Sequence, residues 1–183
     1  MIYRFKLVSD EVSNFSREIE IDSESSFLDL RNVILDSVDY SKDELDSFFL
    51  CDDDWERQEE ITLEDMGSSS DQDIWLMDTT PLSELIEDEG QKLAFVFDYM
   101  TERSFFMELK AMIPGRHLKE PICTIKRGKA PAQIIDINEF EQKIEKAAAA
   151  EAAKLKESDM DADFFGDAEF NEDELPEGFD YDL

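Results

Sequence analysis

The stretch that most constrains the fold is residues 95–109, FVFDYMTERSFFMEL. It holds two apolar runs on either side of a short polar turn, Thr101-Glu102-Arg103. Short apolar runs joined by such a turn are typical of a β-hairpin. We therefore predict strands over 93–98 and 105–113 that form a central hairpin. The side chains that we expect in the core of the sheet are Phe97, Phe105 and Leu109.

Residues 3–38 carry a strand–strand–helix pattern. Residues 3–8 and 15–21 alternate apolar and polar side chains, as half-buried strands do. Over 27–38, apolar residues recur at spacings of three and four, which is helical periodicity, and Ser25 or Ser26 can cap this helix. Two paired strands followed by a helix must cover one face of a sheet. The chain thus predicts an α+β fold, with one mixed, mainly antiparallel sheet, a helix across one face and a β-grasp-like opening.

The segment between this helix and the hairpin is less regular. A short buried strand is expected at 48–51, and the residues over 51–67 indicate an acidic, irregular loop. Thr80 and Pro81 are typical of a helix start, with Thr80 as the N-cap and Pro81 as the first helical residue. We expect Gly90 to end that helix.

Several stretches resemble one known family. They are YRFKL, REIEI and SFLDLRNVILDSVDY near the start, and TPLSELIEDEGQKLAFVFDY before the hairpin turn. The chain resembles the plasmid pRiA-type open-reading-frame-three-like family, whose members are also labelled insertion-element passenger or TnpR-type proteins. The resemblance covers roughly residues 1–131. It implies an α+β domain and brings no established activity.

The family's YDFGDxWxH signature is altered here. Its aromatic–Asp–aromatic core is kept as Phe97-Asp98-Tyr99. Other residues stand in place of the family's glycine, second aspartate, tryptophan and histidine, namely Met100, Thr101, Arg103 and Phe105. Downstream, the Pro-x-Cys pattern is kept at 121–123, but the second cysteine is missing from 127–131. The resemblance therefore implies the fold, and no chemistry that needs this histidine, aspartate or cysteine pair.

The charge of the chain limits its partners and its compartment. The formal net charge is −30, and an acidic surface repels the phosphates of nucleic acids and anionic lipids. We therefore expect neither a general nucleic-acid binder nor a membrane binder. The two cysteines, Cys51 and Cys123, lie far apart in the sequence, and we find neither a leader-like start nor an apolar run long enough to span a membrane. These features predict a cytoplasmic protein.

The chain divides into three parts by composition. Residues 1–135 form the α+β domain, and 136–156 form a C-terminal helix. Residues 157–183 hold 12 acidic residues and no basic one, so we predict a disordered tail that cannot build its own core. Aromatic side chains in such a tail favour docking on a protein partner, which we expect to be basic. These aromatics are Phe164, Phe165, Phe170, Phe179 and Tyr181.

Residues 110–129 are the one basic segment of this acidic chain. We expect them to form a second hairpin, and we take their side chains together with Asp98 as candidate binding residues. Asp98 has two interpretations: an outward or edge position on an alternating strand, or a partly buried carboxylate that pairs with Arg or Lys and anchors the hairpin or a ligand. The candidate binding residues are Asp98, Lys110, Arg116, His117, Lys119, Lys126, Arg127 and Lys129.

No metal, cofactor or catalytic set is predicted. The acidic run at 159–163 fails the EF-hand pattern, because Phe164 and Phe170 stand where that loop needs Gly and Glu. We interpret this run and the one at 52–54 as solvated charge. His117 is the only histidine and has no partner at zinc-site spacing. We therefore expect a non-catalytic binding or adaptor module of unknown process. The alternative is a mobile-element-associated accessory or enzyme that acts on nucleic acid through the basic 110–129 segment.

Overall fold

The computed structural model of the chain describes residues 1–65 and 75–135, together with Asn138, 141–142, 145–146 and 148–149. Contacts divide the chain into two units, Met1–Ile135 and Asp136–Leu183, and the sheet belongs to the first. The described residues beyond Ile135 have helical backbone. The five tail aromatics lie outside the described residues. Among those described, no helix is long and apolar enough to cross a membrane.

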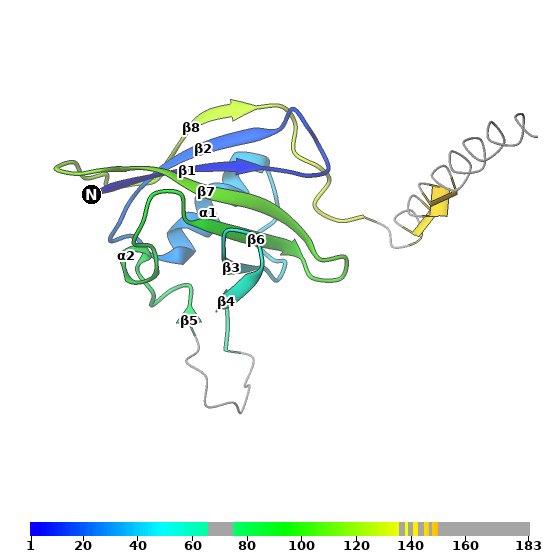
Figure 1. The fold of residues 1–183 in the computed structure, drawn as a ribbon, viewed down its shortest axis with the longest axis horizontal. Coiled ribbons are helices and arrows are strands. Elements are labelled where there is room, and N and C mark those ends of the chain that lie inside the picture. The colour runs from blue at the N-terminus through cyan, green and yellow to red at the C-terminus, as the bar shows by residue number, and fades with distance from the viewer. Residues whose placement is uncertain (66–74, 136–137, 139–140, 143–144, 147, 150–183) are drawn as a thin grey trace, which may run out of the picture. The chain divides into compact units, whose positions relative to one another are not determined.

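Unit 1 is organised around one sheet of eight strands (Figure 1). Its strands are β1 (Ile2–Val8), β2 (Ser16–Asp22), β3 (Ser47–Cys51), β4 (Arg57–Thr62), β5 (Trp75–Leu76), β6 (Lys92–Asp98), β7 (Arg103–Ile113) and β8 (Ile122–Arg127). Their order across the sheet is β5-β4-β3-β6-β7-β1-β2-β8. Only β4 and β5 run parallel, and every other neighbouring pair is antiparallel. The predicted mixed, mainly antiparallel sheet is therefore confirmed.

The central hairpin is β6–β7, as the sequence predicts. Phe95 lies opposite Phe105 in its register, and the turn that joins the strands includes Glu102 in the left-handed region at φ 54°. The three side chains expected in the core are fully or almost fully buried. Phe105 stacks on Phe15 with ring centroids 5.1 Å apart and lies 4.6 Å from the Phe97 ring. The hairpin thus supplies the aromatic centre of the core.

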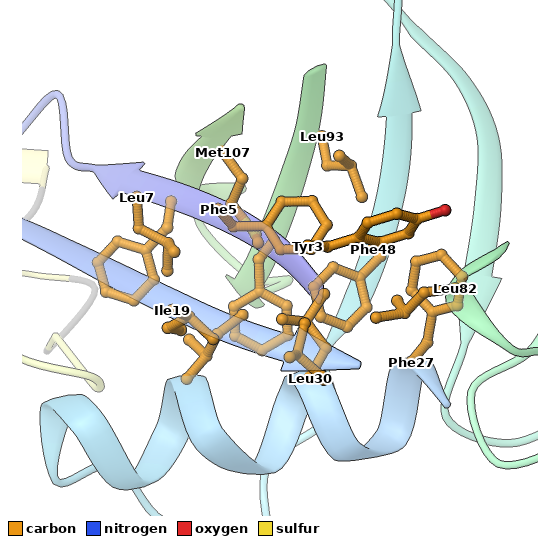
Figure 2. Packing of buried hydrophobic residues seen from close by; sticks show 14 of the residues in the cluster. Tyr3, Phe5, Leu7, Ile19, Phe27, Leu30, Phe48, Leu82, Leu93 and Met107 are labelled. Atoms are coloured by element: carbon orange, nitrogen blue, oxygen red, sulfur yellow. The ribbon is translucent and has the colours of Figure 1, made fainter. Parts of the chain in front are cut away.

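Helix α1 (Phe27–Val38) contributes its apolar side to the same core (Figure 2). Ser26 caps it through a capping box with Asp29, and Asp39 ends it in the left-handed conformation. The Phe27 ring lies 5.5 Å from that of Phe48 on β3. Burial of these rings, rather than helix propensity alone, fixes where α1 sits.

A buried ion pair fixes the connector that follows α1. The Arg31 guanidinium donates to the Asp46 carboxylate at 2.6 Å, and both side chains are almost fully buried. Arg31 also donates to the carbonyl oxygen of Lys42 at 2.9 Å. Because both charges are paired and hydrogen-bonded, this cluster has a structural explanation.

Two local predictions are wrong. The segment 51–67 is not irregular throughout, because β4 runs through it as a strand whose only buried side chain is that of Ile61. Helix α2 (Leu82–Leu85) is shorter than expected: Pro81 is its N-cap residue, and the helix ends before Gly90. Thr80 does not cap α2, because the N-cap is Pro81 and the helix start has no side-chain cap hydrogen bond. The Thr80 carbonyl accepts from the Phe27 backbone N–H at 3.2 Å.

Candidate functional site

An apolar row crosses the face of the sheet that turns away from the core, here called the outer face. Its side chains alternate along β1, β7, β6 and β3 with the buried core residues. The strand register places Val8 opposite Phe106, Phe106 opposite Ala94, and Ala94 opposite Phe49. Four strands thus contribute one apolar side chain each to a continuous row.

A charged row borders the apolar one. Lys6 lies opposite Glu108, and Glu108 lies opposite Lys92 on its other side. The Lys110 ammonium group also lies 2.6 Å from the Glu108 carboxylate. Three lysines therefore lie around the Glu108 carboxylate, and Lys6 also lies opposite Glu18 on β2, so lysine and glutamate side chains alternate along this row.

The loop between β3 and β4 brings Trp55 onto the outer face. Its ring meets that of Phe106 edge-on, with centroids 5.1 Å apart, and the Lys92 ammonium group lies 5.2 Å from the Trp55 ring centre. Trp55 itself has φ 67°, a left-handed conformation that is rare for a large side chain. The Asp52 carboxylate holds the turn by accepting from the backbone N–H groups of Asp54 and Glu56, both at 2.9 Å.

Together these rows and this loop enclose an open hollow of about 130 Å³. Its lining residues are Lys6, Val8, Trp55, Phe106, Met107, Glu108 and Lys110. Val8 is 37% exposed, so the floor offers apolar surface to a ligand. An aromatic floor with ammonium groups at its border suits a ligand that combines an apolar side chain with a carboxylate.

Asp98, a predicted site residue, is the last residue of β6 and does not line the hollow. Its carboxylate accepts from the Thr101 hydroxyl at 2.7 Å and the Met100 backbone N–H at 3.0 Å, and it lies 3.7 Å from the Arg103 guanidinium. The side chain is 14% exposed. Of the two interpretations, the partly buried, paired carboxylate is therefore the one observed, and its contacts serve the hairpin.

Arg103, which stands where the family signature has tryptophan, is a buried tie between segments. Its guanidinium donates to the Glu11 carboxylate at 2.8 Å, to the Ala132 carbonyl at 2.6 Å and to the Gln133 carbonyl at 3.2 Å. It also lies over the Phe97 ring at 5.0 Å. These contacts fasten the end of unit 1 to the central hairpin.

The predicted basic hairpin over 110–129 is wrong. Strands β7 and β8 do not pair, because β1 and β2 lie between them in the sheet. The basic side chains are consequently divided among three places. Lys110 lines the hollow. Lys126 and Arg127 lie on β8, and Lys129 follows just beyond it. Arg116, His117 and Lys119 lie in the segment 114–121 that connects β7 to β8, here called the crossover.

His117 holds the crossover to the end of β2. Its side chain is largely exposed, and its Nδ1 lies 2.9 Å from the Asp22 carboxylate, which also accepts from the Leu118 backbone N–H at 3.2 Å. Burial raises the pKa of Asp22, but the N–H groups of Glu24 and Leu118 and the His117 side chain outweigh it, so that the pKa lies below its usual value. His117 therefore has a structural partner.

The two cysteines were the remaining candidates for metal or thiol chemistry. Within the described residues, no group of three or more His, Cys, Asp or Glu side chains converges as metal ligands would. Cys51 and Cys123 are both free and partly buried. Burial raises the pKa of each thiol, which favours the neutral form.

Of the residues that line the hollow, sequence reasoning named only Lys110 as a binding candidate and missed the others. One signal was available: Phe105 and Phe106 are adjacent in a strand, so one of the two rings must point away from the core. The position of Trp55 carries no such signal. Trp55 and Phe106 are far apart in the sequence, and only the folded sheet brings their rings together.

Comparison with known proteins supports the fold and the family. No curated protein matches the chain. A crystal structure of a protein of unknown function from Methanosarcina mazei Go1 is similar, with a TM-score of 0.57 at 19% identity over 98% of this chain and 94% of that chain. The profile of the plasmid pRiA4b ORF-3-like proteins matches residues 2–176, well beyond the 1–131 span of the sequence motifs. This chain therefore belongs to the plasmid pRiA4b ORF-3-like family.

Proposed function

We propose that this chain is a non-catalytic binding or adaptor module that uses its outer-face hollow to hold a segment of a partner protein. The observation that carries the proposal is the pairing of Trp55 with Phe106 beside exposed Val8, bordered by Lys6 and Lys110. Interface anchors are typically aromatic side chains in partly enclosed positions. The segment that fits carries one apolar side chain next to acidic ones.

The backbone of the Trp55 loop supports a binding role. A left-handed conformation at a tryptophan costs free energy and persists only when the surroundings hold it. Here the Asp52 carboxylate and the Lys92 side chain, which donates to the Asp53 carbonyl, hold the loop. An anchor that is fixed before binding loses less entropy when its partner arrives.

The acidic tail forms the second part of the proposal. Residues 157–183 combine 12 acidic side chains with five aromatic ones, which suits a basic protein surface with apolar pockets.

At the finer level of the fold, we infer a β-grasp-like arrangement in which α1 lies across one sheet face and a C-terminal helix leads to the tail. The free thiols Cys51 and Cys123 fit a cytoplasmic setting.

The structure supports the nucleic-acid alternative less well. That alternative depended on the basic segment 110–129, whose side chains are divided among three places because β1 and β2 lie between β7 and β8. A net charge of −30 also opposes a phosphate backbone at physiological salt.

Site-specific photo-crosslinking tests the hollow. A photoreactive amino acid at position 8, on the floor of the hollow, is compared with one at position 45, where Leu45 is exposed outside it. We expect crosslinks to a defined partner from position 8 and none from position 45. Phe106→Ala should abolish the crosslink because it removes the ring on which Trp55 rests.

Two results would refute the proposal. One is an equal crosslink from positions 8 and 45, which indicates nonspecific contact. The other is a crosslink at position 8 that survives Phe106→Ala in a folded protein.

A further inference from the structure

Strand β8 is the end strand of the sheet and has one unpaired edge (Figure 1). It pairs with β2 over 122–127, and in the part of the chain that the structure describes its backbone makes no other backbone hydrogen bond. The opposite edge strand, β5, spans only Trp75–Leu76. A short edge strand offers little to pair with, whereas the six residues of β8 offer a full row of donors and acceptors.

Nearly all side chains of β8 are exposed to solvent. Five of its six residues are exposed, and only Cys123 is partly buried. Ile122 and Ile125 are 47% and 40% exposed, and both lie opposite outer-face glutamates of β2. The strand thus presents two large apolar side chains next to its free edge.

The charge of this edge is basic. Lys126 and Arg127 lie on β8 and Lys129 follows it, while the strand itself contains no acidic residue. Among the described residues, none of these three side chains takes part in an ion pair. A second copy of β8 would bring like charges together, whereas an acidic strand would bring opposite ones.

The position of β8 is fixed before anything binds. The Arg17 guanidinium, buried beneath it, donates to the carbonyl oxygens of Arg127 at 2.8 Å and Gly128 at 3.2 Å. Gly128 has φ 67°, and a Cβ there would lie 2.5 Å from the Asn14 carbonyl oxygen, so only glycine fits this close approach. The end of the edge strand is therefore held from two sides.

From these observations we propose that an extended acidic segment of a partner protein adds to the free edge of β8 as a ninth strand. Main-chain hydrogen bonds supply the affinity of such strand addition, and side chains supply its selectivity. On an alternating incoming strand, acidic side chains pair with Lys126 on one face, and apolar ones cover Ile122 and Ile125 on the outer face. This surface is separate from the Trp55 hollow, so each can fail without the other.

The test uses the full chain and a synthetic peptide in which Glu and Val alternate. The peptide has about ten residues, which is the length of a long strand. A peptide that alternates Lys and Val is the charge control. Amide hydrogen exchange should slow over 122–127 when the acidic peptide is added at low salt, with no change for the basic peptide. Lys126→Glu should weaken binding about tenfold, since it turns an attraction into a repulsion. Lys119→Glu makes the same charge change on the crossover and should weaken binding far less.

Four outcomes would overturn the proposal. The first is no binding of the acidic peptide at low salt. The second is binding that Lys126→Glu and Lys119→Glu weaken equally, which indicates a nonspecific charge effect. The third is protection around Trp55 rather than over 122–127, which places the acidic ligand in the hollow. The fourth is slow exchange over 122–127 in the free protein that is lost on dilution or at high salt, which means that another copy or the chain itself occupies the edge.

Discussion

Phe105 and Phe106 are neighbours on β7, yet their rings lie on opposite faces of the sheet. Phe105 is fully buried and contacts the rings of Phe15, Tyr40 and Phe97. Phe106 is partly buried and meets one ring, that of Trp55, at the border of an open hollow. The same residue type in the same strand therefore occupies two different environments.

In the proposed function, this difference separates stability from recognition. The core face joins strands and α1 through many apolar contacts, which supply most of the stability of such a domain. The outer face carries fewer apolar side chains. Lysines border them, and the loop that carries Trp55 forms one side of the open hollow. If the outer face binds the proposed partner, we expect changes there to alter binding without unfolding the domain.

Phe105→Ala should have the largest effect. Removal of a fully buried ring leaves a cavity, and such a change typically lowers the free energy of unfolding by about 3–5 kcal/mol. Denaturant unfolding followed by circular dichroism measures it. A loss no greater than that of Phe106→Ala would show that the two faces contribute equally to the free energy of unfolding.

Much of the core face could be predicted from the sequence. Alternation along β1, with Tyr3, Phe5 and Leu7 buried and Lys6 exposed, follows directly from the period of a strand. Strand β4 could not be found in this way, because four of its six residues are exposed and only Ile61 is buried. Its place beside β3 comes from long-range pairing, to which local patterns are blind.

Trp55→Ala should cost less stability than Phe105→Ala. The ring is partly exposed and packs against Phe106 alone among the aromatic side chains, so we expect a loss of about 1 kcal/mol. The same denaturant titration measures it, with crosslinking from position 8 as the second readout. Retained crosslinking in this variant would remove Trp55 from the binding site.

Asp22→Asn tests the polar tie at the end of the outer face. The pKa of Asp22 is lowered in the folded protein, so its carboxylate stabilises the fold above its unfolded pKa of about 4, and this contribution is lost as the pH falls through the folded value. Wild type should therefore exceed Asp22→Asn in stability near neutral pH, and the gap should close in acid. A gap that is constant between about pH 7 and pH 2.5 would contradict the assignment.

Lys110→Ala should have the smallest effect on stability. Its ion pair with Glu108 is exposed on the surface, and such pairs contribute about 0.2–1 kcal/mol. A shift of the melting temperature that disappears at high salt would agree with this assignment. A large, salt-independent loss would mean that Lys110 is part of the packed core.

The candidate site was harder to predict than the fold, for a physical reason. The hollow is assembled from β1, β7 and the loop that carries Trp55, and its parts meet only after the sheet forms. The basic segment shows the converse problem. Its residues are close in sequence, but β1 and β2 separate β7 from β8, so proximity along the chain did not become proximity in space.

The most direct test measures Phe106→Ala in two ways on the same protein. We expect that its free energy of unfolding falls by only about 1–2 kcal/mol, since the ring is partly buried, while the crosslink from position 8 disappears. A loss as large as that of Phe105→Ala would place Phe106 in the stabilising core. An undiminished crosslink in the folded variant would show that the outer-face hollow does not bind the partner.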